Sequence, residues 1–138
     1  MSSALERLKK LSTKITSYEL TRKENFERLK ELFFKLKLDE KINEFETIFS
    51  YKALNLSAIS LQKENFGEIN EGKYLQLLAI VKVDNRSKNI SLGYFGRVEN
   101  VDEKLREEIL EFVIRYRFEK SFINLENYYE MLGRFTNE

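Results

Sequence analysis

The segment Tyr74–Gly96 reads YLQLLAIVKVDNRSKNISLGYFG and decides the fold, because two apolar runs flank a polar turn. The runs Tyr74–Val83 and Ile90–Val98 predict an antiparallel hairpin around the polar segment Asp84–Asn89. An ordinary surface hairpin has one apolar and one polar face. Here one face carries Leu75, Leu77, Ala79, Val81 and Val83, and the other carries Tyr74, Leu78 and Ile80. We expect the first set to lie in the hydrophobic core. The second set is also too apolar to face water, so we expect another part of the chain or a partner to cover it.

The chain before the hairpin also alternates between apolar and polar residues. The alternation runs from Phe45 to Ala53 and then continues one residue out of phase, which predicts a bulge. We therefore expect one long strand or two short ones over Glu46–Leu61, followed by a loop at Gly67–Gly72. Together with the hairpin, these strands predict an antiparallel sheet of three or four strands within residues 44–99.

A helical segment precedes this sheet, within residues 1–40. Apolar residues recur there at spacings of three and four: Ala4, Leu8, Leu11, Ile15, Tyr18, Phe26, Leu29, Phe33 and Leu36. Thr21 and Glu24 fit a capping box, which marks a helix start. The segment Ala4–Leu38 is therefore either one amphipathic helix with a phase shift or two helices that meet near Thr21, and a coiled coil is one use of such a stripe.

Residues 102–135 return to helical periodicity. Asp102 suits the N-cap of a long helix, and the pattern breaks at Ser121–Leu125. A last short helix is expected to stop at Gly133. The order of helix, antiparallel sheet and helices predicts a single α+β domain over residues 1–138.

Composition narrows the class of protein. The 138 residues are 42% hydrophobic and 34% charged, which is typical of a globular chain. The net charge of +1 argues against a dedicated nucleic-acid binder, which needs concentrated positive charge. The charged N-terminus does not resemble a signal peptide, and the longest aliphatic run, Leu77–Val81, is too short to cross a bilayer. We expect a soluble, cytoplasmic protein with no membrane partner.

The chain has neither cysteine nor histidine, so thiol nucleophiles, histidine bases and the zinc sites that use these ligands are excluded. Glu107, Glu108 and Glu111 lie close together but alternate with basic residues, which favours a solvated helix face over a catalytic or metal site. The glycines of Gly93–Gly96 lack the neighbours of a phosphate-binding loop and predict a bulge instead. We expect no enzyme activity, no cofactor and no metal.

Aromatic residues are abundant, with 11 Phe and 7 Tyr. Several lie on predicted core stripes, but the remainder exceeds what one small core absorbs, and such an excess favours an interface. The candidate partner-binding residues are Tyr74, Leu78, Ile80, Tyr94, Phe95, Tyr128 and Tyr129. Tyr94, Phe95 and Arg97 could also stack nucleic-acid bases, although acidic residues follow them directly. We expect a homo-oligomer.

The second half of the chain resembles the strand series of the SecB family of chaperones. The matching stretches are Lys52–Ser60 (KALNLSAIS), Gly72–Val83 (GKYLQLLAIVKV), Ile90–Val98 (ISLGYFGRV), Arg106–Ile109 (REEI) and Asn127–Leu132 (NYYEML). The resemblance spans roughly Phe49–Leu132. It implies a four-stranded sheet backed by helices and a mechanism that holds unfolded or unstable clients on apolar surfaces without chemistry. The added segment Ala4–Leu38 suits a relative that accompanies a toxin–antitoxin pair, with an antitoxin or an export substrate as client.

Two other classes fit the same order of elements. One is a structural assembly module, in which an N-terminal coiled coil dimerises beside a small head similar to the RWD-type kinetochore proteins. The other is a small nucleic-acid-binding accessory protein. Removal of Met1–Leu38 would abolish self-association of the assembly module, whereas an oligomer built through the sheet of a chaperone would survive it.

Overall fold

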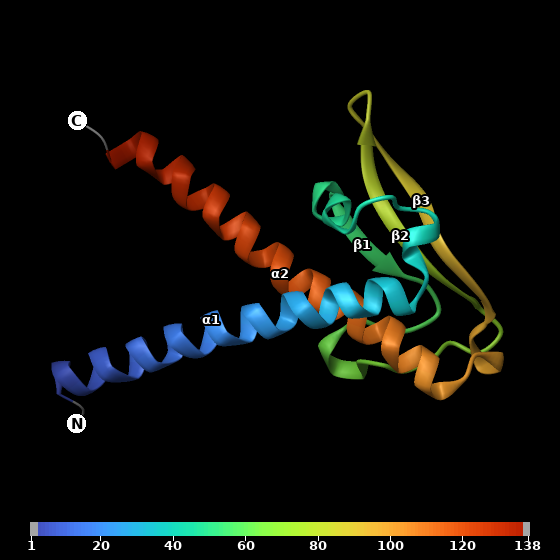
Figure 1. Cartoon of the computed structure of the whole chain (residues 1–138), viewed down its shortest axis with the longest axis horizontal. Coiled ribbons are helices and arrows are strands. Elements are labelled where there is room, and N and C mark those ends of the chain that lie inside the picture. Colours follow the sequence, from blue (N-terminus) through green and yellow to red (C-terminus); the bar gives the residue numbers. More distant parts are fainter. Residues whose placement is uncertain (1–2, 137–138) are drawn as a thin grey trace.

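Two long helices and a three-stranded antiparallel sheet make up the computed structural model of the protein (Figure 1). The structure describes residues 3–136, except the side chains of residues 15–17. In chain order the elements are α1 (Ala4–Lys35), η1 (Leu38–Glu40), η2 (Phe45–Ser50), β1 (Ala53–Leu56), η3 (Lys63–Asn65), β2 (Tyr74–Val83), β3 (Arg86–Arg97), η4 (Val98–Asn100) and α2 (Glu103–Thr136). The predicted α+β class is confirmed.

Helix α1 is one continuous helix rather than two. It begins after Ser3, whose hydroxyl accepts a hydrogen bond from the backbone N–H of Glu6 at 3.1 Å. It ends where Lys37 takes a left-handed conformation with φ of 60°. The capping box predicted at Thr21 is wrong, because the helix passes through that position without a break. The side chain of Ile15, part of the predicted stripe, lies outside the described residues.

The segment Phe45–Ser50 is a 3₁₀ helix, so the strand expected over Glu46–Leu61 is mostly wrong. The ring of Phe45 packs edge-on against those of Phe26 and Phe33 of α1, both at 5.3 Å between centroids. A helical turn brings such a ring onto the core, which outweighs the local alternation. Only Ala53–Leu56 remains a strand, and it pairs antiparallel with β2.

The hairpin forms as predicted but has a tighter turn. Strand β2 spans Tyr74–Val83, whereas β3 already begins at Arg86. Asp84 and Asn85 have φ of 49° and 65°, which is the conformation of a two-residue type I′ turn. Residues 86–89, expected in the loop, therefore pair with residues 80–83. The expected core face also ends early, because Val83 is exposed near the turn.

Two irregularities bend the hairpin near its glycines. The register of β2 against β3 shifts between Leu75 and Gln76 and again between Leu77 and Leu78. In β3 these shifts leave one extra residue on each side of Gly93, as in a bulge. A Cβ at Gly93 would lie 2.9 Å from the ring of Phe95, so only glycine fits without displacing that ring. The bulge predicted from the glycines is confirmed.

Helix α2 is also continuous, so the separate short helix expected near the C-terminus is wrong. The hydroxyl of Ser121 donates to the carbonyl of Phe118 at 2.6 Å, which accommodates this polar residue inside the helix. The ring of Phe122 packs on the ring of Phe118, one helical turn earlier, at 5.1 Å between centroids. This contact joins the two consecutive turns of the helix. Gly133 lies inside the helix and does not end it.

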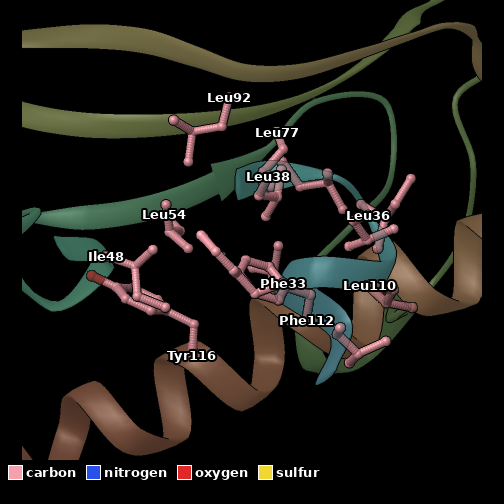
Figure 2. Close-up of a cluster of buried hydrophobic side chains, with 14 of the residues drawn as sticks. Phe33, Leu36, Leu38, Ile48, Leu54, Leu77, Leu92, Leu110, Phe112 and Tyr116 are labelled. Atoms are coloured by element: carbon pink, nitrogen blue, oxygen red, sulfur yellow. The ribbon is translucent and has the colours of Figure 1, made fainter. Parts of the chain in front are cut away.

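The core lies between the sheet and the inner halves of both helices. Figure 2 shows it: Leu54, Leu77 and Leu92 from the sheet meet Phe33, Phe112 and Tyr116 from the helices. The predicted core positions Leu75, Leu77 and Ala79 are fully buried. Among residues 3–136, no helix is both long enough and apolar enough to cross a membrane.

Candidate protein-binding surfaces

Helices α1 and α2 run antiparallel where they leave the head, and polar side chains join them. Lys35 Nζ lies 2.8 Å from Glu108 Oε2 at the inner end. Further out, the side-chain amide of Asn25 donates to the carbonyl of Arg115 at 2.9 Å and accepts from the Arg115 guanidinium at 3.1 Å. Asn25 is buried, and both its amide nitrogen and its amide oxygen take part in these bonds. This crossing fixes the register of the two helices.

Glu111 lies at the centre of the crossing. Its two carboxylate oxygens accept hydrogen bonds from Arg28 Nε at 2.9 Å and Nη2 at 3.1 Å, and Arg115 Nε donates at 2.7 Å. The hydrogen bond from Arg28 is the largest influence on the pKa of Glu111, and the hydrogen bond and charge of Arg115 act in the same direction. Desolvation alone would raise this pKa, but these contacts outweigh it and lower the pKa to about 2. The carboxylate is therefore ionised throughout the ordinary pH range.

Arg22 marks the outer end of the crossing. Its guanidinium lies 2.7 Å from buried Glu119, 3.8 Å from Glu126, and 4.4 Å from the ring centroid of Phe122. Tyr18 meets the same Phe122 ring at 6.3 Å. Beyond this point the helices diverge, as the blue and red ends of Figure 1 show.

We call the outer parts the α1 arm (residues 3–20) and the α2 arm (residues 121–136). Most of the large apolar side chains that lie exposed within residues 3–136 belong to these arms. On the α1 arm they are Leu5, Leu8, Leu11, Tyr18 and Leu20, and on the α2 arm they are Leu125, Tyr128, Tyr129, Met131, Leu132 and Phe135. Exposed apolar side chains gathered in this way on a protein surface mark interaction sites.

The α2 arm is also hollowed. Leu125, Tyr128, Tyr129 and Leu132, together with Glu126 and Glu130, line a largely apolar depression of about 460 Å³. Tyr129 is 78% exposed, so its ring projects into solvent rather than onto its own chain. The arm therefore offers both an apolar surface and a concave shape to a partner.

The second candidate surface is the face of the sheet that points away from the helices. Tyr74 of β2 stacks on Tyr94 of β3 at 5.9 Å between ring centroids. Leu78 and Ile80 lie further along the same face, half-buried beside Asn55 and Ala53 of β1. This face is smaller and more polar than the arms, since Gln76, Asn89 and Ser91 also share it.

The predicted site residues therefore separate into three places. Tyr74, Leu78, Ile80 and Tyr94 share the open sheet face, whereas Tyr128 and Tyr129 lie on the α2 arm. Phe95 is apart from both groups, because the bulge turns its ring over Gly93 and against the core.

Two of the predicted partner-binding residues, Tyr128 and Tyr129, lie on the α2 arm, and none lies on the α1 arm. Leu8 and Leu11 were already visible in the apolar stripe of the first helix. Periodicity identifies such a stripe, but it does not say whether the chain itself covers it.

The carboxylates Glu108 and Glu111 form interhelical ion pairs, which corrects the expected solvated face; only Glu107 of that group is exposed. Within residues 3–136, no cluster of three or more acidic side chains is arranged to hold a metal ion. Comparison with protein-family models, curated proteins and solved structures finds no match to this chain.

Proposed function

We propose that the protein is a non-enzymatic assembly module that binds another polypeptide through its two helical arms. One observation carries this proposal: α1 and α2 diverge beyond Arg22, and each leaves an apolar face uncovered. The head has its own core of buried side chains, so the arms are not needed to complete it.

The energetics support an interaction role for the arms. Most helical stability in proteins comes from the packing of an apolar face, and the apolar faces of the arms are uncovered. Each exposed leucine or aromatic ring gains roughly 1.5–3 kcal/mol when it is buried. A partner that covers both arms therefore stabilises the helices and gains apolar burial in one step.

The open sheet face favours a second candidate, the SecB-like chaperone. Extended apolar segments of an unfolded or unstable client, such as an antitoxin or export substrate, would dock on the stacked Tyr74 and Tyr94 beside Leu78 and Ile80. Family membership stays a prediction here. The arms carry more exposed apolar surface than this face, so we rank the assembly module first.

Affinity purification of three forms from the native host separates the two candidates. The first is the wild type, the second carries Leu125→Ser and Tyr129→Ser on the α2 arm, and the third carries Tyr74→Ser, Leu78→Ser and Ile80→Ser on the sheet. Loss of the co-purifying protein in the arm variant alone supports the assembly module. Loss in the sheet variant alone supports the chaperone and overturns the ranking. Equal recovery in all three forms overturns both proposals.

A further inference from the structure

We infer that the occupant of the arms is a second copy of this chain, with each α1 arm lying along the α2 arm of its partner. This inference rests on the proposed function and names its partner. It predicts a two-fold symmetric dimer in which the same contact is made twice, so that assembly closes at two copies.

The arms do not cover each other within one chain because of the residues on the inner face of α2. Glu119 faces Arg22 of α1, and Glu126 follows it seven residues later on the same face, still within 3.8 Å of Arg22. Glu130 lies four residues further along this face. Closing the arms would place the leucines of the α1 arm on these carboxylates and desolvate the charges.

The apolar side chains Leu125, Tyr129 and Leu132 of the α2 arm lie at other positions around the helix, and Glu126 and Glu130 flank the depression that they line. On the α1 arm, Leu8 and Leu11 continue the stripe that is buried in the head at Leu29 and Leu32, whereas Tyr18 of the same stripe contacts Phe122 of its own chain. Both stripes therefore need an apolar helix as partner. The apolar stripe of an α1 arm and that of an α2 arm can each cover the other when they come from two different chains.

The exposed area fits a stable dimer. The exposed fractions on the arms run from 43% at Tyr18 to 78% at Tyr129 and Phe135. At roughly 150–250 Å² for a whole aromatic side chain, and somewhat less for a leucine, the exposed apolar side chains amount to on the order of 1,000 Å² per chain. A standard stable interface buries about 800 Å² on each partner.

Charge selects the pairing of α1 with α2 over that of α1 with α1. The α1 arm carries four basic residues, Arg7, Lys9, Lys10 and Lys14, against two acidic ones, Glu6 and Glu19. The α2 arm carries two acidic residues, Glu126 and Glu130, against one basic residue, Arg134. Two α1 arms side by side would repel each other, whereas an α1 arm beside an α2 arm brings opposite charges together.

Light scattering of the purified full chain tests the dimer. We expect twice the chain mass of 16.5 kDa at micromolar concentration. Leu125→Ser with Tyr129→Ser, and separately Leu8→Ser with Leu11→Ser, should each weaken dimerisation by roughly 100-fold or more. The matched sheet variant Tyr74→Ser with Leu78→Ser should leave the mass unchanged. A monomeric wild type at about 100 μM overturns the inference, as does a dimer that both arm variants retain.

Cross-linking through introduced cysteines tests the pairing of α1 with α2. The chain has no cysteine of its own, so the reagent reacts only at the introduced positions. Leu8→Cys and Leu132→Cys proteins are prepared separately, and one carries a mass tag. A short bifunctional thiol reagent should join them in the mixture far more than it joins Leu8→Cys to itself. Stronger self-linking of the Leu8→Cys protein overturns the pairing of α1 with α2. Far-UV circular dichroism of each variant confirms that its head remains folded.

Failure of this inference is distinct from failure of the proposed function. A monomeric wild type whose arm variant still loses a host protein overturns the second copy and retains the assembly module. A monomeric wild type without any arm-dependent partner overturns both.

Discussion

Replacement of Glu111 by glutamine should measure how strongly the crossing holds the two helices together. The carboxylate accepts three hydrogen bonds from Arg28 and Arg115 at 2.7–3.1 Å. Glutamine keeps the size of the side chain but removes its charge and one acceptor oxygen. It also leaves two half-buried guanidinium groups beside each other without the anion that separates them.

The magnitude follows from the pKa of Glu111. A shift from the ordinary value of 4.5 to about 2 corresponds to about 3 kcal/mol of stabilisation at neutral pH. Because 31% of the side chain is exposed, solvent screening reduces this to about 1–2 kcal/mol. The pKa is lowered by folding, so this stability is complete above the unfolded pKa and is lost as pH falls from about 4.5 towards 2.

Urea unfolding at pH 7 and pH 2.5, followed by far-UV circular dichroism, checks both the size and the sign. We expect the Glu111→Gln variant to lose about 1–2 kcal/mol of unfolding free energy at pH 7, and this deficit to fall to about a quarter at pH 2.5. Comparison of variant with wild type at each pH cancels the titration of all other carboxyl groups.

The matched control is Glu31→Gln, because Glu31 pairs with the same Arg28 at 2.9 Å but is 65% exposed. It should cost less than about 0.5 kcal/mol at either pH. A Glu111→Gln variant as stable as the wild type at pH 7 would refute the reasoning. So would a deficit that persists undiminished at pH 2.5, since it would come from packing rather than from charge.

Five further substitutions at four positions test the fold. Gly93→Ala should cost about 1–2 kcal/mol in thermal unfolding, because its Cβ would lie 2.9 Å from the ring of Phe95, whereas Gly133→Ala in α2 has no atom within 4 Å and should gain about 0.5–1 kcal/mol. Tyr116→Phe should cost about 1 kcal/mol, since it removes a 3.3 Å bond to a backbone carbonyl. Burial raises the pKa of Tyr116 to about 12, so the wild type alone should lose this tyrosine's stabilising contribution between about pH 10 and 12, measured by urea unfolding. Asn85→Val should cost about 1 kcal/mol or more and Asn85→Gly should not, because φ is 65° there.

The hairpin was predictable because its signal is local. Alternation along Tyr74–Val83 placed Leu75, Leu77 and Ala79 on one face, and the structure buries these three side chains. Strand β2 has the predicted bounds, and apolar residues lie on both of its faces. The turn is shorter than its polar sequence predicts, because polar residues at the start of β3 resemble a loop and the left-handed pair Asp84–Asn85 fixes the register.

The 3₁₀ segment Phe45–Ser50 was not predictable from the same kind of pattern. Its letters alternate as those of a strand do, and they also place Phe45 and Ile48 three residues apart, as a helical turn does. The choice depends on the rings of Phe26 and Phe33, which come from α1 and are distant in sequence. Tertiary contacts of this sort override weak local preferences.

The order of polarity along α1 explains why the α1 part of the candidate surface could be identified only from the structure. The stripe is apolar in the head at Leu29 and Leu32, polar at Arg22 and Asn25, and apolar again in the arm. In a sequence the polar positions look like a flaw in one amphipathic helix. In the fold they meet Glu119 and Arg115, and contacts between the two helices continue only about one turn further out, where Tyr18 meets Phe122. Buried polar contacts of this kind specify register more than they add stability. The leucines beyond them are therefore left for a helix from another molecule, and changing them should affect association and leave the head intact.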